Sequence, residues 1–181
     1  TKIEDIDQIL FKLLVKYASN RGLNIRILGK AREYRWQKKE ISHFERLSFG
    51  YPFEYIRADN ASREYSNYHA LLKSNIAINC GSTLGFEALS LGRKVLFGAT
   101  MDTEFLHQWG VDYYYSNMPE LVRLESGTYQ HFCQKLDSIR ALPQTEFYKI
   151  ISPYSRQIVN TSPTNKPHEY LQNRLEKHLL T

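Results

Sequence analysis

The sequence predicts an α/β protein, a Rossmann-like three-layer domain with a mostly parallel sheet. Short apolar runs alternate with longer segments of helical periodicity, an order typical of parallel strands joined by helices. The stretch 74–98 (SNIAINCGSTLGFEALSLGRKVLFG) has the pattern strand, small turn, helix, strand, which predicts two adjacent parallel strands with a helix crossing between them. In such sheets ligands bind at the carboxyl ends of the strands, so the turns that leave the strands are where a site is expected.

The first half of the chain is expected to contain three helices and two strands. Apolar residues recur at helical spacing from Ile3 to Tyr17, which predicts an amphipathic helix at the start of the chain. Ser62 is a candidate N-cap for the third helix. The expected elements are helix 1–20, strand 24–28 (NIRIL), helix 37–47, strand 52–57 (PFEYIR) and helix 62–72.

The second half begins with the strand, turn, helix and strand described above and is mostly helical after them. Pro143 separates two helical segments, and a polar link with two prolines precedes the last helix. The expected elements are strand 76–79, helix 84–91, strand 94–97, helix 103–109, strand 112–115, and helices 129–142, 145–159 and 168–180.

Length and composition suit one domain or one half of a two-lobed enzyme. The chain has 181 residues, of which 42% are hydrophobic, so it can bury a core. No apolar run approaches the roughly 18 residues that span a bilayer, and no signal segment opens the chain, so a cytoplasmic location is expected. The six histidines show no HxH or HxxxH spacing, and we expect neither a metal site nor a cofactor.

A local basic cluster is the main feature of the charge pattern. The formal net charge is +5, and Glu33 and Glu40 interrupt the cluster. Such a patch suits a phosphate or an anionic membrane face better than duplex DNA, which takes a longer basic surface. No surface with interleaved aromatic and basic residues is evident from the sequence, so no nucleic-acid partner is expected. The cluster consists of Lys30, Arg32, Arg35, Lys38 and Lys39.

The turn at residues 81–85 (GSTLG) is the strongest candidate for a binding site. A helix N-terminus presents unpaired N–H groups and the positive end of the helix dipole, so it attracts phosphate. The turn has neither the GxxxxGK[ST] spacing of a P-loop nor a GxGxxG pattern. Gly81 and Gly85 flank Ser82 and Thr83 and would let a ligand approach the backbone. The alternative is that Ser82 or Thr83 only caps the helix.

Three charged residues extend this candidate site. Glu87 lies one turn beyond Thr83, roughly 6 Å along the same helix face, where its carboxylate could accept hydrogen bonds from ribose hydroxyls. The alternative is an acid that only stabilises the helix dipole. Lys30 and Arg32 follow the first strand and could neutralise a diphosphate or the carboxylate of an acidic sugar; the alternative is solvated surface charge.

The run from Tyr68 to Phe97, with LLKSNIAINCGSTLGFEALSLGRKVLF at its centre, resembles the C-terminal lobe of GT-B glycosyltransferases, in particular enzymes that build bacterial capsule, O-antigen or lipopolysaccharide. The likeness rests on the turn Gly81-Ser82-Thr83, the pair Glu87-Ala88, and the run Leu91-Gly92-Arg93-Lys94-Val95 before the next strand. It implies that Ser82 and Thr83 hold the phosphate of a nucleotide-sugar donor and that Glu87 approaches the ribose or the sugar.

The resemblance also implies how the chain is organised and what it meets. Residues 1–160 would form a nucleotide-sugar-binding lobe, and residues 161–181 a link and a helix that pack on this lobe or on a partner lobe. The N-terminal lobe and the catalytic base would lie outside this chain, so its own catalytic residues stay unknown. The expected acceptor is a glycan or a lipid-linked glycan, and peripheral contact with the inner membrane is a further expectation.

Other functions fit the same residues. A sugar-nucleotide epimerase of the same two-lobed shape and a glycerophosphate-type polymer transferase would use the same turn and the same Glu87. A lobe that binds a nucleotide without catalysis is a third alternative. After the first strand, Gly29-Lys30 stands where sialyl- and Kdo-type transferases carry His-Pro, so the base and the sugar of the donor stay open.

Overall fold

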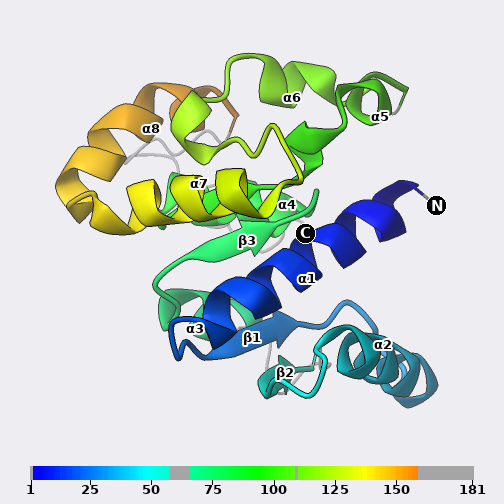
Figure 1. Ribbon diagram of the computed structural model, residues 1–181. Coiled ribbons are helices and arrows are strands. Elements are labelled where there is room, and N and C mark those ends of the chain that lie inside the picture. The colour runs from blue at the N-terminus through cyan, green and yellow to red at the C-terminus, as the bar shows by residue number, and fades with distance from the viewer. Residues whose placement is uncertain (1, 58–65, 109, 159–181) are drawn as a thin grey trace, which may run out of the picture.

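The structure is a computed structural model that describes residues 2–57, 66–108 and 110–158 (Figure 1). Its strands are β1 (Ile25–Leu28), β2 (Phe53–Ile56), β3 (Ala77–Asn79) and β4 (Val95–Phe97). Its α-helices are α1 (Lys2–Ser19), α2 (Tyr34–Leu47), α3 (Ser66–Leu72), α4 (Thr83–Ser90), α5 (Thr103–Gln108), α6 (Asp112–Ser116), α7 (Tyr129–Ala141) and α8 (Gln144–Ile158). The predicted Ser62 cap, the link and the helix 168–180 lie outside the described residues.

The four strands of the described part form two separate parallel pairs. In one pair β1 lies beside β2, with Ile25 opposite Phe53. In the other β3 lies beside β4, with Ala77 opposite Val95. The helix α4 connects β3 to β4, so the predicted parallel pair with a crossing helix is confirmed. Figure 1 shows the β1–β2 pair in the lower part of the molecule and β3 above it.

The prediction of a Rossmann-like three-layer domain with a mostly parallel sheet, of the GT-B C-terminal lobe type, is wrong. No ladder joins the two strand pairs within the described residues, and helices make up most of that part. Residues 112–115, expected to be a strand, lie in the helix α6. Three tyrosines favour a strand there, but Tyr115 is buried and its ring contacts Phe86, so packing decides the conformation.

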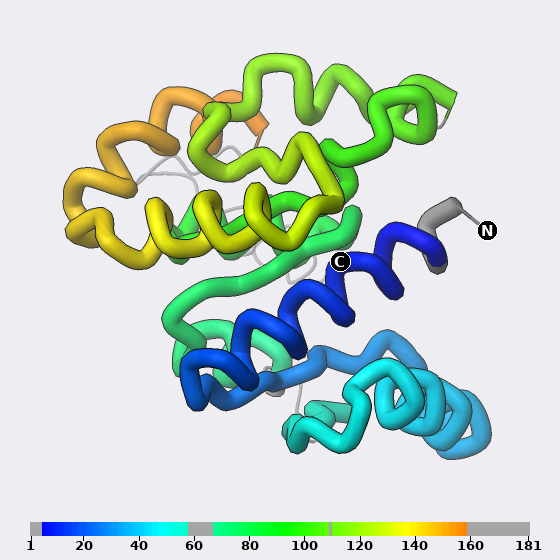
Figure 2. Tube along the Cα trace, in the orientation of Figure 1, coloured from blue at the N-terminus to red at the C-terminus, as the bar shows by residue number. Residues whose placement is uncertain are grey.

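The helix α1 explains why the strands remain in two pairs. Ile6, Leu10 and Tyr17 lie on one face of α1 and belong to the large core around β4. Residues on a second face of α1 (Phe11, Val15 and Ala18) pack with Ile25 and Ile27 of β1 in a smaller core. Figure 2 shows α1 running between the part that contains β2 and the part that contains α7. Each strand pair is therefore packed onto α1 instead of sharing one ladder.

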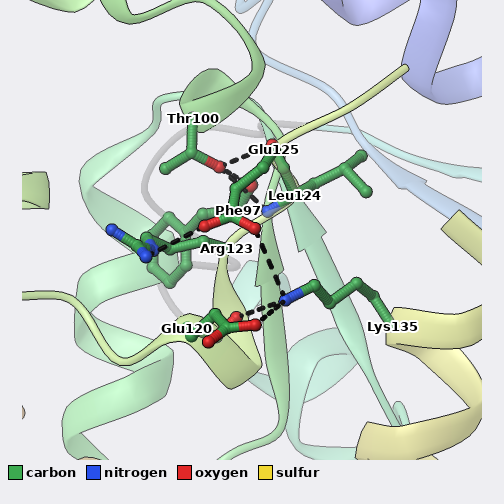
Figure 3. Close-up of polar contacts among 7 residues, drawn as sticks. All are labelled: Phe97, Thr100, Glu120, Arg123, Leu124, Glu125 and Lys135. Carbon is green, nitrogen blue, oxygen red and sulfur yellow. Dashed lines mark hydrogen bonds and ion pairs between the residues drawn. The ribbon is translucent and has the colours of Figure 1, made fainter. Parts of the chain in front are cut away.

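A network of polar contacts holds the segment before α7 against β4 (Figure 3). The Oγ1 atom of the buried Thr100 lies 2.7 Å from the Phe97 carbonyl oxygen and 2.8 Å from the Leu124 carbonyl oxygen, which share its one proton, and it accepts from the Leu124 N–H (2.9 Å). Lys135 of α7 binds the Glu120 carbonyl (2.8 Å). The network extends β4 by one parallel bridge, Phe97 to Arg123, and seats α7 on the core.

Candidate functional site

A cavity of about 1240 Å³ lies between the two strand pairs. The residues at its wall come from α1, both strands β1 and β3, the loops that follow these strands, α3 and α4. Every residue that the sequence selects as a binding candidate lines this one cavity. These residues are Lys30, Arg32, Gly81, Ser82, Thr83, Gly85 and Glu87.

The turn before α4 is shaped by Asn79, the last residue of β3. The Asn79 Oδ1 atom accepts the Ser82 N–H at 3.0 Å, and the Asn79 Nδ2 atom donates to the Ser82 carbonyl at 3.0 Å. Ser82 is the N-cap of α4, because its Oγ atom accepts from the Leu84 N–H at 3.3 Å. The capping role predicted as the alternative is therefore present. The Ser82 hydroxyl proton and the Thr83 N–H have no acceptor within the described part of the chain.

The two glycines of this turn have different surroundings. Gly81 is exposed, and a Cβ atom there would meet nothing within 4 Å, so a ligand can approach the backbone at this point. Gly85 is buried, and a Cβ atom there would lie 2.3 Å from the Asn79 Nδ2 atom. Gly85 therefore makes room for the Asn79 side chain, which in turn holds the Ser82 backbone.

The loop that carries Lys30 and Arg32 is held by α2. The Glu40 carboxylate accepts the N–H groups of Lys30 (3.2 Å) and Ala31 (3.1 Å) and the Tyr55 hydroxyl (2.5 Å). Burial, followed by the hydrogen bond to Glu40, raises the pKa of Tyr55 well above its usual value. A carboxylate that fixes two backbone N–H groups leaves the side chains of this loop free to face the cavity.

Lys30 also approaches the carboxyl end of β3. Its Nζ atom lies 3.9 Å from the Asp7 carboxylate of α1. Burial, followed by the nearby Asp7, raises the pKa of the thiol of Cys80, the residue after β3, far above its usual value. The loops after β1 and β3 thus meet at Asp7. A thiol with a raised pKa is a poor nucleophile, so Cys80 has a structural place at the wall of the cavity.

Glu87 is paired with Tyr68 of α3. The Tyr68 hydroxyl donates to the Glu87 Oε2 atom, and this bond, followed by burial, raises the pKa of Tyr68 to about 12. The contact ties α3 to α4 across the cavity wall and fixes the direction of the carboxylate. Glu87 keeps a second carboxylate oxygen, and a carboxylate has more lone pairs than one tyrosine can use.

The Tyr68–Glu87 contact predicts a loss of stability in alkali. Because the pKa of Tyr68 is raised from 10 to about 12 in the folded state, its contribution is present below pH 10 and is lost as the pH rises towards 12. Tyr115, whose pKa burial raises to about 12, acts in the same window. Urea titrations between pH 9 and about 12 should show a fall in the free energy of unfolding that is smaller in Tyr68→Phe. An identical fall in both proteins would contradict the contact.

Sequence reasoning missed four residues that shape the cavity. Asn79 holds the turn before α4, and Tyr68 holds the Glu87 carboxylate. Glu40 holds the loop that carries Lys30, and Asp7 lies where the loops after β1 and β3 meet. Asn79 alone had a local signal, an asparagine two residues before a glycine-serine turn, whereas the others act across the fold. The Oδ1 atom of Asn67, at the start of α3, is buried at the same wall without a hydrogen-bond partner in the described part of the chain.

A second cavity, of about 760 Å³, lies between α1 and the turn that follows α2. It is mostly apolar, with Lys12 and Lys16 among its lining residues, and no predicted site residue lines it. Across residues 2–57, 66–108 and 110–158, no three His, Cys, Asp or Glu side chains lie close enough to hold a metal ion. No helix in these same ranges has the length and apolar character needed to cross a bilayer.

Comparison with known proteins adds one finding. A family model described as "putative O-antigen biosynthesis protein" matches residues 4–165. No curated protein and no solved structure matches the chain. Because the family model covers well over half of the sequence, the chain belongs to this family, which links it to the biosynthesis of a surface polysaccharide.

Proposed function

We propose that the chain binds a nucleotide-sugar in the cavity between the strand pairs and serves as the donor-binding part of a glycosyltransferase in O-antigen biosynthesis. The observation that supports this proposal is the convergence of all seven candidates on one cavity wall. A volume of about 1240 Å³ exceeds what most small ligands need and suits a ligand with a base, a diphosphate and two sugar rings.

The diphosphate would bind between the turn before α4 and the loop after β1. The Thr83 N–H and the Ser82 hydroxyl proton are donors at the positive end of the α4 dipole. Ser82 can cap the helix and bind phosphate together, because it accepts one hydrogen bond with its oxygen and donates another with its proton. Lys30 and Arg32 supply two positive charges from the loop after β1.

Glu87 would bind hydroxyls of the ribose or of the sugar. Its carboxylate lies one helical turn beyond the phosphate-binding turn and is held in place by Tyr68. The buried Asn67 Oδ1 atom is a second acceptor on the same wall. Acceptors next to a cationic region suit a ligand whose charged diphosphate is flanked by hydroxyl groups.

The chemical contribution of the cavity would be electrostatic. When the bond from the sugar to the diphosphate breaks, negative charge grows on the leaving nucleoside diphosphate. Fixed N–H groups and cations around the phosphate stabilise that charge more in the transition state than in the ground state. We propose that the acceptor and the base that deprotonates it come from a further domain or a partner.

Titration calorimetry of UDP, GDP, CDP and pyrophosphate into the wild type and Glu87→Gln tests this proposal. Gln keeps the shape and can still accept from Tyr68, but it loses the charge. We expect it to weaken the binding of the preferred nucleotide by about 0.5–3 kcal/mol. Pyrophosphate binding should stay unchanged or improve slightly, because a negative charge near the anion is removed.

Three further variants separate phosphate binding from helix capping and provide a matched control. If phosphate binds at the turn, Ser82→Ala and Thr83→Ala should each lower the affinity for both the nucleotide and pyrophosphate. If Ser82 is only a helix cap, Ser82→Ala should lower the free energy of unfolding by about 1 kcal/mol and leave both affinities unchanged. Glu146→Gln, an exposed acid in the first turn of α8, is the matched control. Equal effects of Glu87→Gln on nucleotide and pyrophosphate would refute the hydroxyl assignment, and the absence of any nucleotide binding would refute the function.

A further inference from the structure

The helix α2 turns a basic and aromatic face to the solvent. It lies at the edge of the molecule in Figure 1, and its opposite side packs inward through the buried Gln37 and the partly buried Phe44. The exposed side chains include two large aromatic ones, Tyr34 at 61% and Trp36 at 46% exposure. We call this surface the α2 basic face, and it consists of Tyr34, Arg35, Trp36, Lys38, Lys39 and Arg46.

Among the residues that the structure describes, the cations of the α2 basic face form no ion pair with an acidic side chain. Three of them lie over aromatic rings instead: Arg35 and Lys39 at 4.7 and 4.4 Å from the centre of the Trp36 ring, and Lys38 at 4.7 Å from that of Tyr34. Positive charge therefore outnumbers negative charge on the outside of α2, where four exposed basic side chains face one exposed acid, Glu45.

The orientation of this face is fixed by the body of the protein. Glu40 of α2 binds the backbone of the loop after β1, and the Gln37 Nε2 atom donates to the carbonyl oxygens of Ala31 and Arg32. The Phe44 ring packs against Phe11 of α1, with ring centres 4.9 Å apart. A partner that binds the α2 basic face thus meets a preformed helix, so binding costs little conformational entropy of its backbone.

We propose that the α2 basic face docks the protein on a lipid surface that carries anionic headgroups. Each lysine or arginine near such a surface attracts it, and exposed tryptophan and tyrosine rings settle at the level of the headgroups. The helix contributes its polar, cationic side to the membrane while its apolar side stays in the core. Docking would be peripheral. It would hold the loop that carries Lys30 near the membrane plane, since that loop directly precedes α2.

A single-stranded nucleic acid is the competing partner, because the structure shows the interleaving of aromatic and basic residues that the sequence did not reveal. Two observations favour the lipid surface. Arg35 and Lys39 already occupy ring-face area of Trp36 that a stacked base would need. In addition, neither described cavity is lined by Tyr34, Trp36 or Lys38, so neither of these two cavities can hold a nucleic-acid strand along the face.

Co-sedimentation with sucrose-loaded vesicles tests the proposal on the full chain. Vesicles of phosphatidylcholine with one quarter phosphatidylglycerol should bind the wild type, and pure phosphatidylcholine vesicles should not. K38E/K39E should lower the partition coefficient on the order of 30-fold or more. K149E/R156E, on the exposed side of α8, changes the net charge equally and should lower it less than about threefold. High salt should abolish binding by the wild type.

Tryptophan fluorescence gives a readout that does not depend on how the charge-reversal variant folds. The chain has two tryptophans, so in Trp109→Phe the emission comes from Trp36 alone. We expect a blue shift of this emission on anionic vesicles only. Equal losses in the two charge-reversal variants, an unshifted Trp36 emission, or tighter binding to a single-stranded uridine oligonucleotide than to the vesicles would overturn the proposal.

Discussion

The double substitution of Lys30 and Arg32 by alanine should lower the affinity for UDP, or for the preferred nucleotide, by about a hundredfold. Each cation can form a charge-assisted hydrogen bond to a phosphate oxygen, and such bonds contribute about 1.5–3 kcal/mol. We use the lower end of this range, because the Lys30 side chain is 68% exposed and water competes for it. Calorimetry with the nucleotide and with pyrophosphate measures the effect, which should be similar for both ligands.

A matched pair of cations outside the cavity provides the control for this prediction. Lys149 and Arg156 are exposed on α8 and do not line the cavity, so their double alanine variant removes the same charge elsewhere. It should change the affinity less than about threefold at moderate salt. If both double variants weakened binding equally, the long-range charge of the protein would explain the effect and the diphosphate assignment would be wrong.

The second large effect concerns the two faces of α1. Phe11→Ala removes a buried ring from the smaller core, where it makes edge contacts with Phe44 and Phe53, and should cost about 3–5 kcal/mol of unfolding free energy. Leu10→Ala acts on the larger core. The Leu10 side chain lies so close to Gly98 that a Cβ atom there would be 2.1 Å from the Leu10 Cδ1 atom, and we expect a loss of about 2–5 kcal/mol.

Urea denaturation followed by circular dichroism measures these losses and shows whether α1 joins the two cores. Ile9→Ala is the matched control, because Ile9 adjoins Leu10 on α1 and is 42% exposed, and it should cost well under the core variants. If α1 couples the cores, both core variants shift one cooperative transition. Two transitions, with Phe11→Ala moving only one of them, would show that the strand pairs unfold independently.

Much of the secondary structure was predictable from the sequence, because it is determined by signals that are local. The apolar spacing of α1, the Pro143 break between α7 and α8, and the serine before α4 are such signals, and all agree with the structure. The parallel pairing of β3 with β4 was predictable for a similar reason, since a short helix between two short strands leaves a parallel crossover as the favoured connection. The local composition of residues 112–115 was misleading, because burial of Tyr115 overrides strand propensity there.

The sequence by itself determined which residues could bind a phosphate and a hydroxyl, because a helix start with Ser82 and Thr83 and an acid one turn later are visible as spacing. Only the tertiary structure decided that Lys30 and Arg32 share a cavity with them, since 48 residues lie between Arg32 and Gly81 in the sequence and packing on α1 brings the two loops together. Tertiary packing also decided the number of sheets. The sequence pattern identifies which segments are strands. The side chains of α1 that pack on both strand pairs determine which strands pair in a ladder.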